Sequence, residues 1–220
     1  MRFSCIAIAI AGLGGAANAQ DSDSTAVPRH TLEVWTAVAR DQPLKTRNGR
    51  LHDRDLYVIG GRARWPLARW TNVEVAYTTD VLPAIISTGM PAYSDSLLTC
   101  PPNEPCVLPI IPNRVMTRHT TYGAGAAPLG LEVRLRAAPP LSFLVRGSAG
   151  VVYFSRPVPD PAEKRLNFML DAGVGAEVRL TPRVGIVVGY SLNHISNAGR
   201  GPVNPAMDSR MVELGLTFAR

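Results

Sequence analysis

The feature that most constrains the fold is an alternation of apolar residues with small or charged residues that recurs along the chain. It is found in eight segments of strand length: 31–40, 55–67, 72–85, 120–137, 141–155, 165–181, 183–196 and 209–219. Successive side chains of a β-strand point to opposite faces. In segment 165–181 every even position from Leu166 to Leu180 is apolar, whereas the odd positions include Asn167, Asp171 and Glu177. This period of two predicts strands that each have one apolar face.

The second face of these segments distinguishes a membrane barrel from a soluble sandwich. In a sandwich that face meets bulk water, and lysine is expected there. Here it carries seven acids, six arginines and no lysine: Glu33, Arg62, Arg64, Glu74, Asp80, Glu132, Arg134, Arg136, Arg146, Asp171, Glu177, Arg179 and Glu213. Arginine and carboxylate pair through parallel hydrogen bonds, and a narrow barrel has room for side chains but not for a water channel. The chain is therefore predicted to be all-β, an eight-stranded antiparallel transmembrane β-barrel with a filled polar interior.

The lengths of the connections support this fold. Three long connections (41–54, 86–119 and 197–208) and one of intermediate length (156–164) alternate with short ones (68–71, 138–140 and Pro182 alone). Short periplasmic turns and long outer loops are typical of outer-membrane barrels. Ser196 and the loop after it are therefore predicted at the outer rim. Trp65, Trp70 and Tyr153 lie near strand ends, as expected of interfacial aromatic girdles.

The N-terminal residues predict export. Residues 1–19 combine one basic residue, an apolar run and Ala17-Asn18-Ala19, the pattern of a secretory signal peptide with its cleavage site. We expect this segment to be removed, leaving a single barrel domain over residues 20–220. Cys100 and Cys106 bracket a proline-rich loop, and in an oxidising compartment they are predicted to form a disulfide.

Several other classes of protein are disfavoured. The glycine-rich stretches 123–130 and 173–178 lie in predicted strands, with no following helix or acidic partner at dinucleotide-binding spacing. The four histidines show no ligand spacing, so no metal site is expected. The net charge, +6 and +5 without Arg2, does not by itself indicate a nucleic-acid partner, and none is expected. After the signal, the sequence contains no apolar run of the ~18–20 residues that a membrane helix needs.

A candidate site lies at the end of segment 183–196. His194 and Ser196 end its apolar face, two positions apart and therefore on one side of the strand, about 7 Å apart at the backbone. A serine needs an adjacent base to attack an ester, and the base needs an orienting partner. Asp208 shares the parity of Val212, so antiparallel pairing can bring it beside either residue. The three residues predict a triad, although contact with lipid head groups alone would also explain polar residues at the rim.

The segment from Tyr190 to Leu216, YSLNHISNAGRGPVNPAMDSRMVELGL, resembles the C-terminal signature of the outer-membrane lipid A 3-O-deacylase family. That signature is His-x-Ser-Asn-Ala, a glycine-rich loop with Asn-Pro or Pro-Asn, and an acidic residue twelve positions after the serine. The matching residues are His194, Ser196, Asn197, Ala198, Asn204 and Asp208. The chain departs from the pattern at Asp208, where the best-known members carry glutamate.

The resemblance implies an esterase on the barrel exterior that removes the 3-position acyl chain of lipid A and requires no cofactor. Its partners would be lipid A or lipopolysaccharide of the outer leaflet and the outer membrane itself. Ser196 would be the nucleophile, His194 the base and Asp208 its orienting partner. The candidates for oxyanion donors are Asn197, Gly199 and Asn204.

Basic residues crowd the predicted outer loops and are candidates for contacts with lipid A phosphates. The main candidates are Lys45, Arg47, Arg50 and Arg200, accompanied by Arg54, Arg114, Arg118, Lys164 and Arg165. A merely solvated basic rim would produce the same pattern.

Two alternative hypotheses stay open at this point. The first is a non-enzymatic small outer-membrane barrel, for adhesion or membrane integrity, that kept the family's loop. The second is a soluble periplasmic β-sandwich or lipid-binding barrel. A requirement for detergent separates the second from a membrane barrel, and lipid A hydrolysis separates the first from an esterase.

Overall fold

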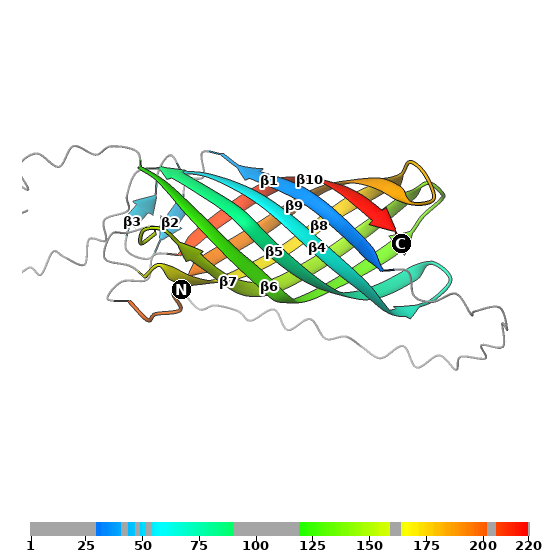
Figure 1. The fold of residues 1–220 in the computed structure, drawn as a ribbon, viewed down its shortest axis with the longest axis horizontal. Helices are drawn as coiled ribbons and strands as arrows, with labels where there is room; N and C mark the ends of the chain where they lie inside the picture. Colours follow the sequence, from blue (N-terminus) through cyan, green and yellow to red (C-terminus); the bar gives the residue numbers. More distant parts are fainter. Residues whose placement is uncertain are drawn as a thin grey trace, which may run out of the picture.

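The computed structural model describes residues 30–40, 44–46, 49–51, 54–89, 119–158, 164–201 and 206–219. Eight of their strands form a closed barrel (Figure 1). Within these residues the eight barrel strands are β1 (Thr31–Ala39), β4 (Asp55–Arg69), β5 (Val73–Gly89), β6 (His119–Arg136), β7 (Leu141–Phe154), β8 (Leu166–Arg179), β9 (Val184–Ser196) and β10 (Met207–Ala219). All neighbours are antiparallel, and β1 pairs with both β10 and β4. The predicted fold is confirmed, and the sandwich hypothesis is excluded.

The connections agree with the predicted orientation. Short turns over 70–72, 137–140 and 180–183 lie at one end of the barrel (Figure 1). At the other end, β2 (Leu44–Thr46) pairs with β3 (Gly49–Leu51) inside the predicted loop 41–54. This small hairpin was not predicted. The described residues contain no helix of sufficient length and apolar character to cross a membrane.

The outward face of the barrel is an apolar wall. On β8, β9 and β10 its exposed side chains include Leu170, Val174, Val188, Leu192, Val212, Leu214 and Leu216. Trp70 and Tyr153 are exposed at opposite ends of the barrel, whereas Trp65 packs against Tyr77 with ring centroids 5.7 Å apart. Tyr57 and Tyr122 lie at the same end as Tyr153. An apolar band with aromatic residues at both edges fits a bilayer.

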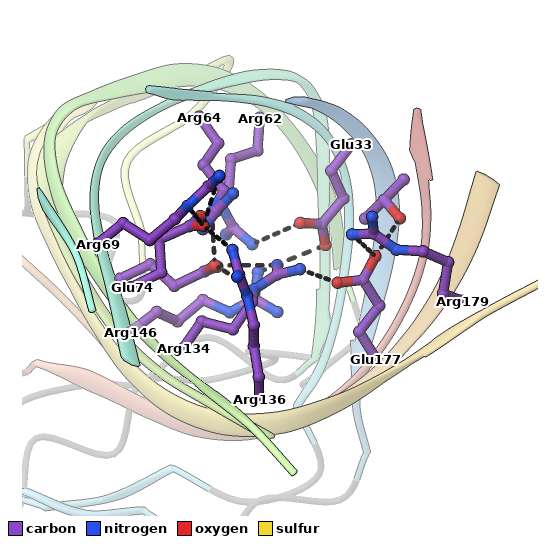
Figure 2. Close-up of polar contacts among 12 residues, drawn as sticks. Glu33, Arg62, Arg64, Arg69, Glu74, Arg134, Arg136, Arg146, Glu177 and Arg179 are labelled. Carbon is purple, nitrogen blue, oxygen red and sulfur yellow. Dashed lines mark hydrogen bonds and ion pairs between the residues drawn. The ribbon is translucent and has the colours of Figure 1, made fainter. Parts of the chain in front are cut away.

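The inward faces of the strands hold a network of ion pairs (Figure 2). Arg62 on β4 donates two hydrogen bonds to Asp80 on β5, from Nε to Oδ1 at 2.7 Å and from Nη2 to Oδ2 at 3.1 Å. Arg62 and Arg146 also share two acids, with nitrogen–oxygen distances of 3.5 and 3.4 Å to Glu33 and 3.5 and 3.1 Å to Glu213. These residues come from β1, β4, β5, β7 and β10. The network therefore ties together strands from all around the barrel.

A second group of ion pairs lies nearer the short turns. Glu74 binds Arg64 and also accepts hydrogen bonds from Arg69 at 2.8 Å and Arg136 at 2.6 Å. The other pairs of this group among the described residues are Arg64–Glu132, Arg134–Glu132, Arg134–Glu177 and Arg179–Glu177. Buried charges persist only where partners compensate the loss of water. The prediction that the charges of the second face pair inside the barrel is thus confirmed for all of them except Asp171, which instead accepts hydrogen bonds from Ser191 at 3.1 Å and Asn193 at 3.4 Å.

The outer half of the interior is apolar, which the sequence pattern did not reveal. Its buried side chains include Leu56, Leu82, Phe154, Met169, Ile195 and Met207. They lie toward the strand ends that face the long connections. There both faces of a strand can be apolar: Phe154 points inward beside the outward Tyr153. The barrel is thus filled by ion pairs in one half and mainly by hydrocarbon side chains in the other, with a few buried polar residues such as Arg54, Ser87 and Asn167 among them.

Prolines within strands coincide with shifts in strand register. Pro66, Pro83 and Pro128 each lie at such an irregularity. Proline has no amide hydrogen to donate to the ladder, so regular pairing cannot continue through it. Around Pro83, the inward-facing positions change from even at Leu82 to odd at Ile85. Counting parity along the sequence therefore fails beyond this point of β5.

Trp35 interrupts the predicted alternation of segment 31–40 because it shares a face with Glu33. The structure places its side chain in the interior, 6% exposed. The Arg62 guanidinium lies 5.2 Å from the centroid of its ring. Gly60 makes room for the ring, since a Cβ there would lie 2.4 Å from Trp35 Cε2. The alternation of β1 is regular, and Trp35 is an interior residue that happens to be apolar.

Replacing Arg62 by methionine should destabilise the barrel, because Asp80 would stay buried without its main partner. We expect the free energy of unfolding to fall by about 3–5 kcal/mol, as for other broken buried ion pairs, measured by urea unfolding in phospholipid vesicles. Arg69→Met is the matched control, since its side chain is 51% exposed and Glu74 keeps Arg64. Equal stability of the two variants would show that the Arg62 pairs contribute little.

Candidate active site

The pairing of β9 with β10 brings the three predicted residues together at the outer end of the wall. His194 lies directly opposite Asp208 in the register. Ser196 follows two residues later on the same face of β9. On the other side of β9, Leu170 and Phe168 of β8 lie opposite His194 and Ser196. Alternation turns all of these side chains outward, so the site faces the membrane and not the barrel interior.

The three side chains form a hydrogen-bonded chain. His194 Nδ1 lies 2.6 Å from Asp208 Oδ1, and His194 Nε2 lies 3.2 Å from Ser196 Oγ. With its hydrogen on Nδ1, the imidazole donates to Asp208 and accepts the serine hydroxyl hydrogen at Nε2. A serine hydrolase uses this order of acid, base and nucleophile. The side chains of His194 and Asp208 are 43% and 62% exposed, so a substrate has access to both.

The register explains how an aspartate can reach His194 at the position where the best-known members of the similar family carry glutamate. Residues directly opposite one another in an antiparallel pair have Cβ atoms about 4.5–5.5 Å apart. Because Asp208 is directly opposite His194, its short side chain already reaches Nδ1. The departure from the family pattern is therefore compatible with the geometry.

The candidate oxyanion donors lie in the turn that follows Ser196. Ala198 and Gly199 have φ angles of 55° and 75°, and the Arg200 amide donates to the Asn197 carbonyl at 3.3 Å. The Gly199 amide donates to the Asn197 side-chain oxygen at 2.8 Å, so its hydrogen is engaged within the turn. Asn197 directly follows the serine and has a buried side chain. Asn204 lies outside the described residues.

Arg200 lies beside the site, but its guanidinium already has protein partners. Its Nε donates to the Asn197 carbonyl at 3.2 Å, and its Nη2 donates to the Leu166 carbonyl at 3.4 Å. The guanidinium carbon lies 4.5 Å from the centroid of the Phe168 ring. The structure thus places Arg200 within the turn that directly follows Ser196.

The other predicted basic residues fall into four groups. Lys45 is paired with Arg50 in the β2–β3 register, while Lys164 and Arg165 are exposed before β8. Arg47, Arg114 and Arg118 lie outside the described residues. The expectation for Arg54 was wrong: it is 6% exposed and its Nη1 donates to Ser87 Oγ at 2.8 Å. It points inward because it follows the inward parity of Leu56 on β4.

Two arginines near the triad were missed in the sequence. Arg210 is exposed on β10 and shares the outward parity of Asp208. Arg40 is exposed just after β1, and continuing the register from Val38 opposite Val212 brings Arg40 alongside Arg210. The sequence did contain a signal for their position, since both arginines have the same parity as the outward apolar residues of their strands. Charged residues on a lipid-facing wall are costly and usually functional.

Some predictions concern parts of the chain that the structure does not describe. Cys100, Cys106 and residues 1–19 lie outside the described residues, so the disulfide and the signal peptide stay predictions. Within the described ranges, histidine, cysteine and carboxylate side chains form no group of three or more that could hold a metal ion.

Comparison with known proteins bears on the strands that carry the triad. Residues 116–217 match the family model of lipid A 3-O-deacylase (PagL). The match spans β6 to β9 and most of β10, and it confirms the family resemblance of the segment from Tyr190 to Leu216. Together with the closed barrel and its apolar wall, it supports an outer-membrane location.

Solved structures show a similar fold. The crystal structure of the outer membrane enzyme PagL is 16% identical, with a TM-score of 0.56 over 83% of this chain and 97% of that chain. Neisserial surface protein A (NspA) is 14% identical, with a TM-score of 0.50 over 86% and 96% of the two chains. At these identities the likeness shows the fold alone. Among curated proteins, none matches this chain in sequence.

A lipid-tailed fluorophosphonate should react with Ser196, because His194 can remove the proton of its hydroxyl. We expect Ser196→Ala to abolish labelling and His194→Ala to slow it by at least about 100-fold, measured by in-gel fluorescence of the folded barrel. Ser209→Ala is the control, since Ser209 is buried on the inward face of β10. Labelling that survives Ser196→Ala would place the reactive serine elsewhere.

Proposed function

We propose that the protein is an outer-membrane esterase that removes the 3-position acyl chain of lipid A. The observation that carries this proposal is the Ser196–His194–Asp208 chain of hydrogen bonds on the outward wall. The match of residues 116–217 to the PagL family supports the same substrate. A site on this wall meets the ester of a membrane lipid without extracting the lipid from the bilayer.

The geometry suggests the order of steps. The Ser196 oxygen attacks the ester carbonyl while His194 Nε2 takes the hydroxyl proton, and Asp208 stabilises the resulting imidazolium. The tetrahedral intermediate collapses, the bond between the acyl carbon and the sugar's ester oxygen breaks, and His194 gives the proton to this departing oxygen, which leaves as the sugar hydroxyl while the acyl group stays on Ser196. Water then attacks the acyl-serine with the same base, releasing a fatty acid and restoring Ser196.

In this mechanism the turn after Ser196 stabilises the negative charge of the tetrahedral intermediate. The oxyanion needs preorganised N–H groups close to the carbonyl oxygen of the ester. Asn197, next to the nucleophile, is the best-supported donor among the three candidates. Gly199 would first have to release its bond to the Asn197 side chain.

The arginines around the triad suit a phosphorylated lipid. Arg40 and Arg210 lie on the β1–β10 side, and Lys164 and Arg165 lie on the β8 side. Phosphate oxygens accept charge-assisted hydrogen bonds from guanidinium groups. Such contacts offset the cost of keeping Arg40 and Arg210 on an apolar wall.

A non-enzymatic barrel is the alternative. The likeness to NspA, a surface protein, shows that this architecture also serves proteins other than PagL. The interior ion pairs that hold the barrel do not involve Ser196, His194 or Asp208. The fold would therefore persist without any chemistry at the triad, and activity must be measured.

Expression in a Gram-negative host should remove one acyl chain from its lipid A, detected by mass spectrometry. We expect Ser196→Ala and His194→Ala to leave lipid A intact while both barrels keep heat-modifiable gel migration, which reports folding. Incubation of the purified barrel with lipid A of several acyl patterns controls for an unsuitable host lipid. Intact lipid A in all these assays with folded wild type would favour the non-enzymatic barrel.

Two substitutions test the acid of the triad. Asp208→Asn should lower the rate of fatty-acid release by about 10³- to 10⁴-fold, because an amide neither orients nor stabilises the histidine as a carboxylate does. Asp208→Glu keeps the carboxylate and should retain most of the rate. Initial rates on lipid A in mixed micelles provide the measurement. A fully active Asp208→Asn variant would remove Asp208 from the mechanism.

A further inference from the structure

We propose that Arg200 is a positioning residue whose guanidinium holds the turn after Ser196 in the shape that stabilises the oxyanion. The inference deepens the proposed esterase function and rests on it. It differs from the expectation that Arg200 serves mainly as a contact for lipid A phosphate.

The turn needs such support because of its backbone conformation. The φ angles are positive at both central residues, Ala198 and Gly199, and a hydrogen bond from the Arg200 amide to the Asn197 carbonyl closes the turn. Positive φ at both positions is typical of a type I′ turn. For alanine this conformation is unfavourable, because Cβ crowds the backbone. A non-glycine residue keeps it only where its surroundings enforce it.

The Arg200 side chain supplies a link between the turn and the neighbouring strand. Its Nε and Nη2 donate to the carbonyls of Asn197 and Leu166, at 3.2 and 3.4 Å. Its guanidinium carbon lies 4.5 Å from the centroid of the Phe168 ring. Leu166 and Phe168 begin β8, whereas Asn197 directly follows β9. One planar group therefore connects the turn to β8 through three contacts, one with the turn and two with β8.

This link bears directly on the reacting atoms. Phe168 lies opposite Ser196 in the β8–β9 register, so Arg200 packs on the residue beside the nucleophile. Two hydrogen bonds from Arg200, one from its amide and one from Nε, hold the carbonyl of Asn197, the best-supported oxyanion donor, and so fix the position of that residue next to Ser196. Donors to an oxyanion are effective only when their positions are fixed before reaction. Loosening the turn should therefore slow the chemical step.

Positioning and phosphate binding predict different kinetics. A residue that only binds the lipid A phosphate changes KM, and lysine replaces it well because the charge is kept. A residue that positions the turn changes kcat, and lysine replaces it poorly because an ammonium lacks the planar fork that spans two carbonyls and stacks on a ring.

The experiment compares Arg200→Lys and Arg200→Met in rates of fatty-acid release from lipid A in mixed micelles. We expect both to lower kcat by about 10- to 100-fold, less than the loss of a whole oxyanion donor, with little change in KM or in urea stability. Arg156→Met is the control, because Arg156 is an exposed arginine at the same end of the barrel. Full kcat in Arg200→Lys, with a raised KM in Arg200→Met, would overturn the proposal in favour of phosphate binding.

A second measurement does not depend on activity. Amide hydrogen exchange over residues 196–200, followed by mass spectrometry on the folded barrel, should be faster in Arg200→Met than in wild type, with β9 unchanged. Equal exchange would overturn the proposal whatever the rates. Faster exchange in a barrel whose wild type hydrolyses no lipid A would instead overturn the esterase function and leave the structural role of Arg200 in place.

Discussion

In the hydrocarbon of a bilayer every backbone amide and carbonyl must find its hydrogen-bond partner within the protein. Pairing of β1 with both β4 and β10 meets this requirement by removing all free edges from the sheet. Closure also confines the charged inward faces to a narrow space, where they persist only as pairs. Arg62 and Arg146 share Glu33 and Glu213. These ion pairs and the apolar outer wall therefore have the same origin, which is the need to close the sheet inside a bilayer.

The candidate active site depends on that closed ladder. His194 and Asp208 meet because the β9–β10 register leaves them directly opposite, and sites built on strands are held more accurately than sites on loops. The proposed oxyanion donors are the exception, since they lie in the turn after Ser196. There the contacts of Arg200 with Asn197 and Leu166 replace the missing ladder.

The two halves of the chain contribute different parts of the structure, one the candidate site and the other a large share of the interior ion pairs. The PagL-family match covers β6 to β10, which carry Ser196, His194 and Asp208. The strands before it, β1, β4 and β5, supply Glu33, Arg62 and Asp80 to the interior. The first half is thus constrained mainly by closure and internal charge balance. The second half is constrained in addition by the geometry of the site.

The sequence by itself determined the strands, most of their outward faces and which three residues make up the candidate site, because a period of two assigns a face to each residue from local information alone. It could not reveal the apolar outer half of the interior, since at those strand ends Phe154 and Tyr153 are apolar on both faces. It misplaced Arg54 because this residue was assigned to the loop before β4, although it shares the inward parity of Leu56. It did not locate the parity change at Pro83, because that change depends on pairing between strands. Only the tertiary structure decided that Asp208 meets His194 and that Arg200 binds the turn, since a register and a contact belong to two segments at once.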